Sequence, residues 1–342
     1  MRQGSCRYSM ANAKEREHMV KAVILFLIGF VCLIKGGDWF VDGATSLAHR
    51  FHMPEILIGA TVVSIGTTIP EVMVSATGAL TGGAGGSAIA YGNAIGSVIC
   101  NTSLIAAITL AVRPAPIEKK AIRTPLIFFF IAAAIYCGVA YTSGYFSRPV
   151  GIVLLTLFVV YIIIAVKQAL SSPKPEKSDE AAEEEMPIWK TLLLLVAGAA
   201  VIAVGANLLV DNGTYIAEAL GVPHTVIALT FVALGTSLPE LITAITALVK
   251  GHSDLSLGNV IGANLFNLVL VSGLATTLAP FEIPCEKTIA GMNASLVVDI
   301  PVMLGVMLIV SLPAMIKGKL YRWQGILLLC IYAAFCAFQF VG

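Results

Sequence analysis

Long runs of apolar residues, separated by short polar segments, recur along the whole chain. A helix that crosses the hydrocarbon core of a bilayer needs about 20 mostly apolar residues, and the chain contains ten runs of roughly that length or more. The predicted spans lie near 20–38, 54–80, 88–112, 124–142, 148–167, 188–210, 223–249, 256–280, 294–312 and 323–341. The pattern predicts an all-α polytopic membrane protein with ten transmembrane helices.

The composition agrees with a chain that lies in lipid. Of the 342 residues, 58% are hydrophobic and 12% are charged, and the mean hydropathy is +0.90. Soluble domains carry about 25% charged residues. The net charge of +1 excludes nucleic acid as a partner, because binding to phosphate backbones needs clustered Lys and Arg. The lipid bilayer is therefore the expected surrounding of the chain.

The chain contains an internal duplication. Residues 36–71 share their pattern with residues 205–240, and both segments end in Gly-Thr-x-x-Pro-Glu. A second match pairs GNAIGSVICN at 92–101 with GNVIGANLFN at 258–267. Each half holds five spans, an odd number, so the second half enters the membrane with opposite polarity, as in transporters built from inverted repeats. The sequence predicts two inverted five-helix repeats.

Four segments follow from this division. They are an N-terminal polar tail at 1–18, a first repeat at 19–170, a charged linker at 171–187 and a second repeat at 188–342. Lys and Arg are concentrated in the loops that follow the odd-numbered spans. By the positive-inside rule these loops and the linker are cytoplasmic, and both termini are extracytoplasmic.

One glutamate lies within each of two equivalent spans. Glu71 and Glu240 occupy matching repeat positions, and the second and seventh spans contain no Lys or Arg to neutralise them. An ionisable residue within a bilayer costs about 3 kcal/mol or more and marks an ion pathway by default. Pro70 and Pro239 precede them, and a proline frees a backbone carbonyl and kinks a helix. We expect both glutamates to line a polar cavity.

Hydroxyl groups accompany both glutamates. Thr67, Thr68, Thr236 and Ser237 precede them by three or four residues and so share their helix face. Carboxylate, hydroxyl and carbonyl oxygens suit hard cations such as Ca²⁺, which takes about 6–8 oxygen ligands, and not Zn²⁺ or Cu²⁺. We therefore expect a site for a transported cation, and no cofactor.

A polar stripe follows on the third and eighth spans. Asn93, Ser97 and Asn101 recur at a spacing of four, which places them on one helix face, and Asn259 and Asn267 match the first and last of them. An amide can offer an oxygen ligand or can hydrogen-bond a neighbouring helix. We expect Asn101 and Asn267 to be ligands, and Asn93 and Asn259, near the helix starts, to cap or pack helices.

The repeats GATVVSIGTTIPE with GNAIGSVICN, and ALTFVALGTSLPE with GNVIGANLFN, strongly resemble those of the calcium/cation antiporter family, in particular its compact prokaryotic sodium/calcium exchangers. The resemblance covers nearly the whole chain. It implies a ten-helix protein of the prokaryotic cell membrane that exchanges Na⁺ for Ca²⁺ by alternating access. Spans 2, 3, 7 and 8 would hold the ions, and spans 1 and 6 would slide across them.

The resemblance also implies a set of ion ligands, carried over residue by residue. The side chains are those of Thr67, Thr68, Glu71, Ser97, Asn101, Thr236, Ser237, Glu240 and Asn267. The backbone carbonyls of Ser64 and Ala233 are implied as further Na⁺ ligands.

The chain departs from the family pattern at a few positions. Ala263 stands where the family commonly has a serine that matches Ser97, and Val98 and Cys100 replace other residues of the usual motif. The loss of a hydroxyl at Ala263 is expected to weaken one Na⁺ position. The family implies three Na⁺ for one Ca²⁺, so we expect electrogenic exchange, by a protein that functions as a monomer.

Two alternatives remain to be compared. A proton-coupled exchanger of Ca²⁺ or another divalent cation would use Glu71 and Glu240 as proton carriers, since burial favours the neutral form of a carboxyl group. A membrane-embedded hydrolase would need a nucleophile or zinc motif, and neither G-x-S-x-G nor H-E-x-x-H occurs in the chain. The sequence therefore predicts a transporter and not an enzyme.

Overall fold

The computed structural model describes residues 2–81, 83–114, 117–170, 186–221, 235–285 and 287–341, and most of them are helical. The helices of the first half are α1 (Arg2–Arg50), α2 (Glu55–Ile58), α3 (Ser64–Thr81), α4 (Gly83–Cys100), α5 (Ala107–Val112), α6 (Lys119–Thr142) and α7 (Arg148–Leu170). Those of the second half are α8 (Ile188–Ala219), α11 (Leu238–Lys250), α12 (Ser253–Phe266), α13 (Ser272–Leu278), α14 (Ile300–Lys317) and α15 (Arg322–Val341).

In the described part of the chain, four π-helical segments lie next to these α-helices. They are η1 (Gly59–Val63), η2 (Asn101–Ala106), η4 (Asn267–Val271) and η5 (Ser295–Asp299). Each adjoins at least one α-helix directly in sequence, so that α2, η1 and α3 form one span, as do α4, η2 and α5. The second half repeats this arrangement with α12, η4 and α13.

The all-α membrane architecture predicted from the apolar runs is confirmed. Nine helices in the described part of the chain are long and apolar enough to cross a bilayer. The seventh predicted span, 223–249, is described only from residue 235 onward. Residues 171–185 of the linker predicted at 171–187, and Ala233, lie outside the described residues. The first helix is longer than the predicted span 20–38, because α1 runs without a break from Arg2 to Arg50.

Two small β-ladders join loops at one end of the bundle. β1 (Tyr145–Phe146) pairs antiparallel with β2 (Phe281–Glu282), and β3 (Thr288–Ile289) pairs with β4 (Met292–Asn293). The turn between β3 and β4 has positive φ at both central residues, Ala290 (50°) and Gly291 (79°), as a tight hairpin turn requires. These strands are too short to alter the helical fold class.

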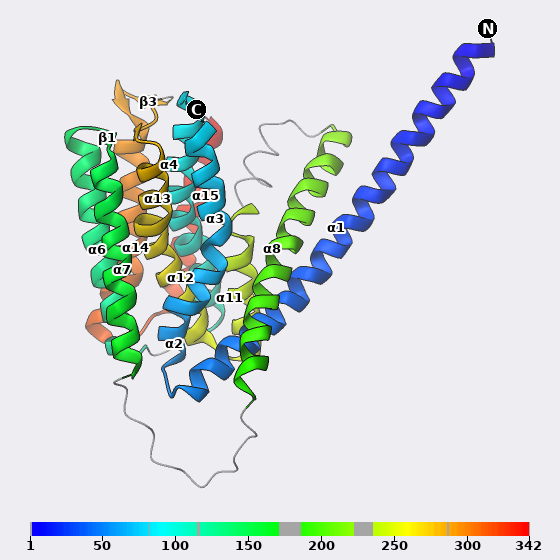
Figure 1. The fold of residues 1–342 in the computed structure, drawn as a ribbon. Coiled ribbons are helices and arrows are strands. Elements are labelled where there is room, and N and C mark those ends of the chain that lie inside the picture. The colour runs from blue at the N-terminus through cyan, green and yellow to red at the C-terminus, as the bar shows by residue number, and fades with distance from the viewer. Residues whose placement is uncertain are drawn as a thin grey trace.

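The first helices of the two repeats pack antiparallel, as inversion requires. A Cβ atom on Gly29 would lie 2.9 Å from the Gly205 carbonyl oxygen, and one on Gly36 would lie 3.0 Å from the Gly198 carbonyl oxygen. The sequence order of the contacts on α1 is thus reversed on α8. Figure 1 shows this pair beside the main bundle, with both chain ends at one end of the molecule and the beginning of α8 at the other.

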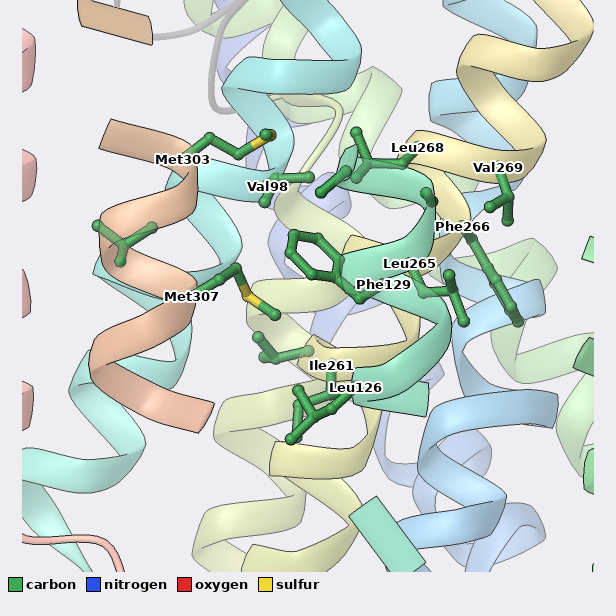
Figure 2. Packing of buried hydrophobic residues seen from close by; sticks show 14 of the residues in the cluster. Val98, Leu126, Phe129, Ile261, Leu265, Phe266, Leu268, Val269, Met303 and Met307 are labelled. Carbon is green, nitrogen blue, oxygen red and sulfur yellow. The ribbon is translucent and has the colours of Figure 1, made fainter. Parts of the chain in front are cut away.

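The main bundle is held by a large apolar core. Figure 2 shows Phe129 of α6 facing Val98 of α4 and Met307 of α14, with Phe266 of α12 in the same apolar cluster. Phe129 and Phe266 are both 0% exposed, and within lipid such side chains stabilise the fold mainly through van der Waals packing. A second, smaller cluster includes residues of α1 and α8. The bundle therefore has a core of its own, apart from the α1–α8 pair.

Candidate cation-binding site

The two predicted glutamates meet inside the protein. Glu71 of α3 and Glu240 of α11 are both 0% exposed, and their carboxyl groups lie close enough to interact electrostatically. One comes from each repeat. Two carboxylates held together away from water repel each other unless a cation or a proton lies between them.

Several of the predicted ligands carry buried polar atoms that have no hydrogen-bond partner. Within the described residues, six of these side chains carry buried oxygens without a hydrogen-bond partner: Thr68, Glu71, Asn101, Ser237, Glu240 and Asn267. All six are 0–2% exposed. Most buried polar atoms in proteins are hydrogen-bonded, so a group of carboxylate, hydroxyl and amide oxygens left unpaired fits the coordination of a hard cation.

Two of the π-helical segments begin at the predicted amide ligands. η2 starts at Asn101 and η4 starts at Asn267, which are equivalent positions of the two repeats. A π-helical turn disturbs the regular i to i+4 ladder and is frequent at functional sites. The pattern of side chains does not indicate π-helical turns, so these turns could not be predicted from the sequence.

Asn93 connects the two repeats. Its amide nitrogen donates to the backbone carbonyl of Glu71 at 3.0 Å and to Ser75 Oγ at 2.8 Å, and its amide oxygen accepts a hydrogen bond from Thr236 Oγ1 at 3.2 Å. In the other repeat, Asn259 Oδ1 accepts from Thr67 Oγ1 at 3.2 Å. Both asparagine side chains therefore form hydrogen bonds between helices, which is the packing role that was expected of them.

The expected position of these asparagines near helix starts is wrong. α4 begins at Gly83 and α12 begins at Ser253, so Asn93 and Asn259 lie inside the helices and cap neither of them. At these positions inside the helices, each amide oxygen accepts a hydrogen bond from a threonine of the opposite repeat.

The two threonines are oriented by these bonds. Because Thr67 and Thr236 each donate their hydroxyl proton to an amide oxygen, their lone pairs remain free to coordinate a cation. Ser97 is buried, with 4% exposure. The Ser64 hydroxyl lies 2.8 Å from the Gly59 carbonyl oxygen and 2.9 Å from the Asn259 carbonyl oxygen. Its predicted contribution, the Ser64 carbonyl, lies one helical turn before Thr67.

The two prolines differ in their surroundings. α3 continues as a helix through Pro70, whereas Pro239 lies in the first turn of α11, which begins at Leu238. Gly235 is helical and residues 236 and 237 form a turn before α11, so the helix is interrupted just before Pro239, as expected. Proline is well accommodated at such a helix start, where its missing N–H is not needed. Glu240 lies in this first turn, where the helix dipole favours a negative charge.

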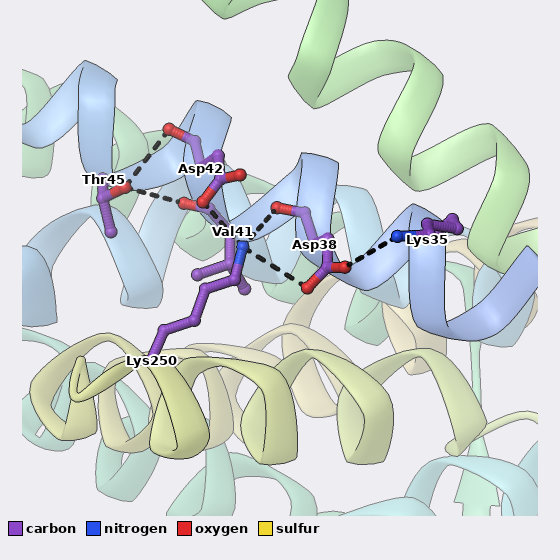
Figure 3. Close-up of polar contacts among 6 residues, drawn as sticks. All are labelled: Lys35, Asp38, Val41, Asp42, Thr45 and Lys250. Carbon is purple, nitrogen blue, oxygen red and sulfur yellow. Dashed lines mark hydrogen bonds and ion pairs between the residues drawn. The ribbon is translucent and has the colours of Figure 1, made fainter.

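Three further aspartates lie elsewhere in the fold and do not contact the two glutamates. Lys250 Nζ lies 2.7 Å from Asp42 Oδ1 and 3.4 Å from Asp38 Oδ1, and Figure 3 shows how these contacts join α1 to α11. Asp211 is exposed on α8. Asp299 accepts a hydrogen bond from Gln339. Asp42 thus has a cationic partner on α11.

A cavity of about 480 Å³ reaches the site from the side of α8. It is lined by Pro70 of α3, Asn207 and Asp211 of α8, and Thr236. Thr236 is also one of the predicted ligands, so this cavity adjoins the predicted cation site.

Comparison with known proteins shows the family of this chain. The model of the sodium/calcium exchanger protein family matches residues 21–167 and 190–341. The chain belongs to this family. The resemblance noted in the repeats is thereby confirmed, and the chain is a multi-pass membrane transporter and not an enzyme.

Individual relatives match over most of their length. The sodium/calcium exchanger MaX1 of Methanosarcina acetivorans is 28% identical over 93% of this chain and 98% of its own. An inner membrane protein of Escherichia coli is 35% identical over 78% of this chain and 82% of its own. A solved structure of the sodium-calcium exchanger NCX_Mj has a TM-score of 0.76 and 33% identity, and covers 93% of this chain and 99% of its own.

Proposed function

We propose that this exchanger moves Na⁺ and Ca²⁺ in opposite directions through a single site around Glu71 and Glu240. The observation that carries the proposal is the pair of buried carboxylates, one from each repeat, together with further buried oxygens that have no hydrogen-bond partner. Two negative charges balance one Ca²⁺ completely. The names of the relatives MaX1 and NCX_Mj support the same pair of ions.

The proposed ligands are those implied by the repeats. The side chains are Thr67, Thr68, Glu71, Ser97, Asn101, Thr236, Ser237, Glu240 and Asn267, with the carbonyls of Ser64 and Ala233. All of these are oxygen donors, which favours Na⁺ and Ca²⁺ over softer metals. Asn93 and Asn259 are proposed to orient two of the threonines and not to touch the ion.

Alternating access is proposed to come from movement of the α1–α8 pair across the bundle. Three glycines of α1, at a spacing of seven, face α8 closely, so these two helices are bound to each other as a unit. The apolar cluster that contains α1 and α8 also includes Ile58, Ala247 and Leu255 of the bundle, so the unit would move across these contacts. The larger core contains no described residue of α1 or α8, which supports movement of the unit without disruption of that core. Contacts between α1 and α11, such as the ion pairs of Lys250 with Asp38 and Asp42, would break or form as the unit moves.

We propose the cell membrane as the location, with the linker in the cytoplasm and both termini outside. The positive-inside bias of the loops supports this orientation, and the Escherichia coli relative is named an inner membrane protein. One chain contains both halves of the site, which supports function as a monomer.

The decisive experiment compares two driving forces. Proteoliposomes loaded with Na⁺ are diluted into Na⁺-free medium with ⁴⁵Ca²⁺, and a parallel sample has an acidic interior and no Na⁺. We expect uptake driven by the Na⁺ gradient. Uptake driven only by the pH gradient would instead support the proton-coupled alternative, in which Glu71 and Glu240 carry protons.

A further inference from the structure

A second cavity, of about 320 Å³, lies away from the proposed exchange site. It is bounded by α4, η5 and α15 and by the segment that leads into the β3–β4 hairpin. Figure 1 shows the hairpin and the end of α15 at the same end of the molecule. This is the end that the charge bias of the loops assigns to the cell exterior.

The cavity contains a carboxylate with oxygen-bearing neighbours. Its lining includes Asp299 and Ser295, the last and first residues of η5, and Tyr91 of α4. Gln339 donates a hydrogen bond to Asp299 Oδ1 at 3.0 Å. Among the described residues Tyr91 has no hydrogen-bond partner for its hydroxyl, although only 3% of the side chain is exposed. Tyr91 and Asp299 lie close enough to interact electrostatically.

An open stretch of the α4 surface, at two glycines, borders the cavity. Gly92 and Gly96 line the cavity, and a Cβ atom on either would meet nothing within 4 Å. Cys100 follows at the same spacing of four, so it lies on the same helix face. Cys100 lies close enough to Glu240 to interact electrostatically. The cavity and the exchange site are thus arranged along one stripe of α4.

The cationic residue of the lining is held by neutral partners. The Lys287 ammonium donates to the Phe338 carbonyl at 2.5 Å and lies 3.9 Å from the centroid of the Phe338 ring. It forms no ion pair with Asp299 within 4.0 Å in the described structure. The negative charge of Asp299 is therefore not neutralised by a direct ion pair with Lys287. The positive charge of Lys287 nevertheless limits how strongly the cavity attracts cations.

We propose that Asp299, with the hydroxyls of Tyr91 and Ser295, binds Ca²⁺ weakly and raises its local concentration before it enters the exchange site. The role in transport rests on the proposed function, whereas the binding does not. One carboxylate and neutral oxygens give low affinity, which suits capture followed by release. The Asp299 carboxylate attracts cations locally by this kind of focusing, and the Lys287 ammonium in the same lining opposes it.

The first test measures binding without transport. ⁴⁵Ca²⁺ equilibrium binding is measured on the full-length purified protein with Glu71→Gln and Glu240→Gln, which removes the charge of the exchange site. We expect one weak residual site that is lost on adding Asp299→Asn and retained on adding Glu282→Gln, which changes an exposed carboxylate at the same end. Absence of a residual site, or its survival in Asp299→Asn, would overturn the inference.

The second test measures its consequence in proteoliposomes. Asp299→Asn keeps an oxygen that can accept from Gln339, and it should raise the KM for Ca²⁺ by about threefold to tenfold with an unchanged maximal rate. Lys287→Gln should lower the KM, and Glu282→Gln should leave it unchanged. Gly96→Leu, which fills the open stretch of α4, should also raise it. A KM that stays the same in both Asp299→Asn and Gly96→Leu would contradict recruitment, and loss of Na⁺-driven exchange in the unmodified protein would contradict only the proposed function.

Discussion

At the scale of single residues, the two repeats differ around the same pair of glutamates. Glu71 lies within a helix that continues past Pro70, whereas Glu240 lies in the first turn of α11. Ser97 has Ala263 as its counterpart, and Ser64 has Ala233. In the proposed site the two halves therefore contribute unequally, and the first repeat supplies more hydroxyl groups.

Replacing Glu71 or Glu240 by Gln should abolish Ca²⁺ transport. Either change removes half of the negative charge of a buried site, and an uncompensated buried charge costs about 3–5 kcal/mol. The measurement is Na⁺-driven ⁴⁵Ca²⁺ uptake by protein of verified insertion, with Glu282→Gln as the matched exposed control. Uptake near the unmodified level in either variant would refute the assigned site.

Ala263→Ser should tighten Na⁺ binding. Ala263 is 0% exposed on α12 and occupies the repeat position of Ser97, so a hydroxyl there would supply the missing oxygen. One added oxygen contact of about 0.5–1 kcal/mol corresponds to a roughly twofold to fivefold lower Na⁺ half-saturation. The Na⁺ dependence of Ca²⁺ uptake measures this, and an unchanged dependence would show that this position does not line a Na⁺ site.

At the scale of elements, the α1–α8 pair depends on close approach of two helices. Gly29, Gly36 and Gly43 of α1 recur every seven residues and face α8. A spacing of seven returns to almost the same helix face after two turns. Small residues at such an interface allow the backbones to approach closely in lipid, where no hydrophobic effect drives helices together.

Gly198→Leu should separate this pair. A Cβ atom on Gly198 would lie 2.6 Å from the Phe40 backbone nitrogen, so the backbone of α1 would have to move, and overpacking of this kind costs about 1–3 kcal/mol. We expect lower thermal stability in detergent and loss of exchange. Gly138→Leu on α6, where a Cβ would meet nothing within 4 Å, is the control and should retain both. Equal effects of the two variants would exclude a special role for the α1–α8 interface.

Lys250→Gln should loosen the contact between α1 and α11. The variant removes the charge that faces Asp38 and Asp42 (Figure 3), and a partly exposed ion pair contributes about 1 kcal/mol or less. Hydrogen exchange measured by mass spectrometry should become faster by up to about fivefold in the last turns of α1. Lys167→Gln, an exposed change on α7, should not alter it, and protection that stays the same in Lys250→Gln would show that these ion pairs do not hold the contact.

At the scale of the whole molecule, the charge of the site determines how exchange responds to voltage. Two carboxylates and one Ca²⁺ sum to zero, whereas three Na⁺ leave one excess positive charge. Movement of one charge across the membrane changes the free energy by about 2.3 kcal/mol per 100 mV. Three-to-one exchange would therefore carry charge outward when Ca²⁺ enters a liposome.

Na⁺-driven ⁴⁵Ca²⁺ uptake should accelerate at an inside-positive potential. Three Na⁺ leave the liposome as one Ca²⁺ enters, so the net positive charge moves outward and is favoured by a positive interior. The potential is set with valinomycin and K⁺, with external K⁺ in excess for the inside-positive case. Uptake that does not depend on potential would indicate an electroneutral exchange of two Na⁺ for one Ca²⁺.

The sequence by itself determined the membrane class, the inverted repeats and the residues of the proposed site. Apolar runs and the recurrence of Gly-Thr-x-x-Pro-Glu carry this information locally, because an ionisable residue in a span is costly wherever the helix packs. The unequal roles of asparagines on one stripe were also expected, with Asn101 and Asn267 unpaired and Asn93 joined to the opposite repeat.

Only the tertiary structure decided which atoms meet across the repeats. The contact of Thr236 with Asn93, the π-helical turns at Asn101 and Asn267, the start of α11 at Leu238, and the cavity at Asp299 all depend on helices distant in sequence or on backbone geometry. The hydrophobic period specifies which face of a helix is buried, but it does not specify its partner or how far along it the partner lies. For that reason the sequence proposes residues for the site but does not specify how they are arranged.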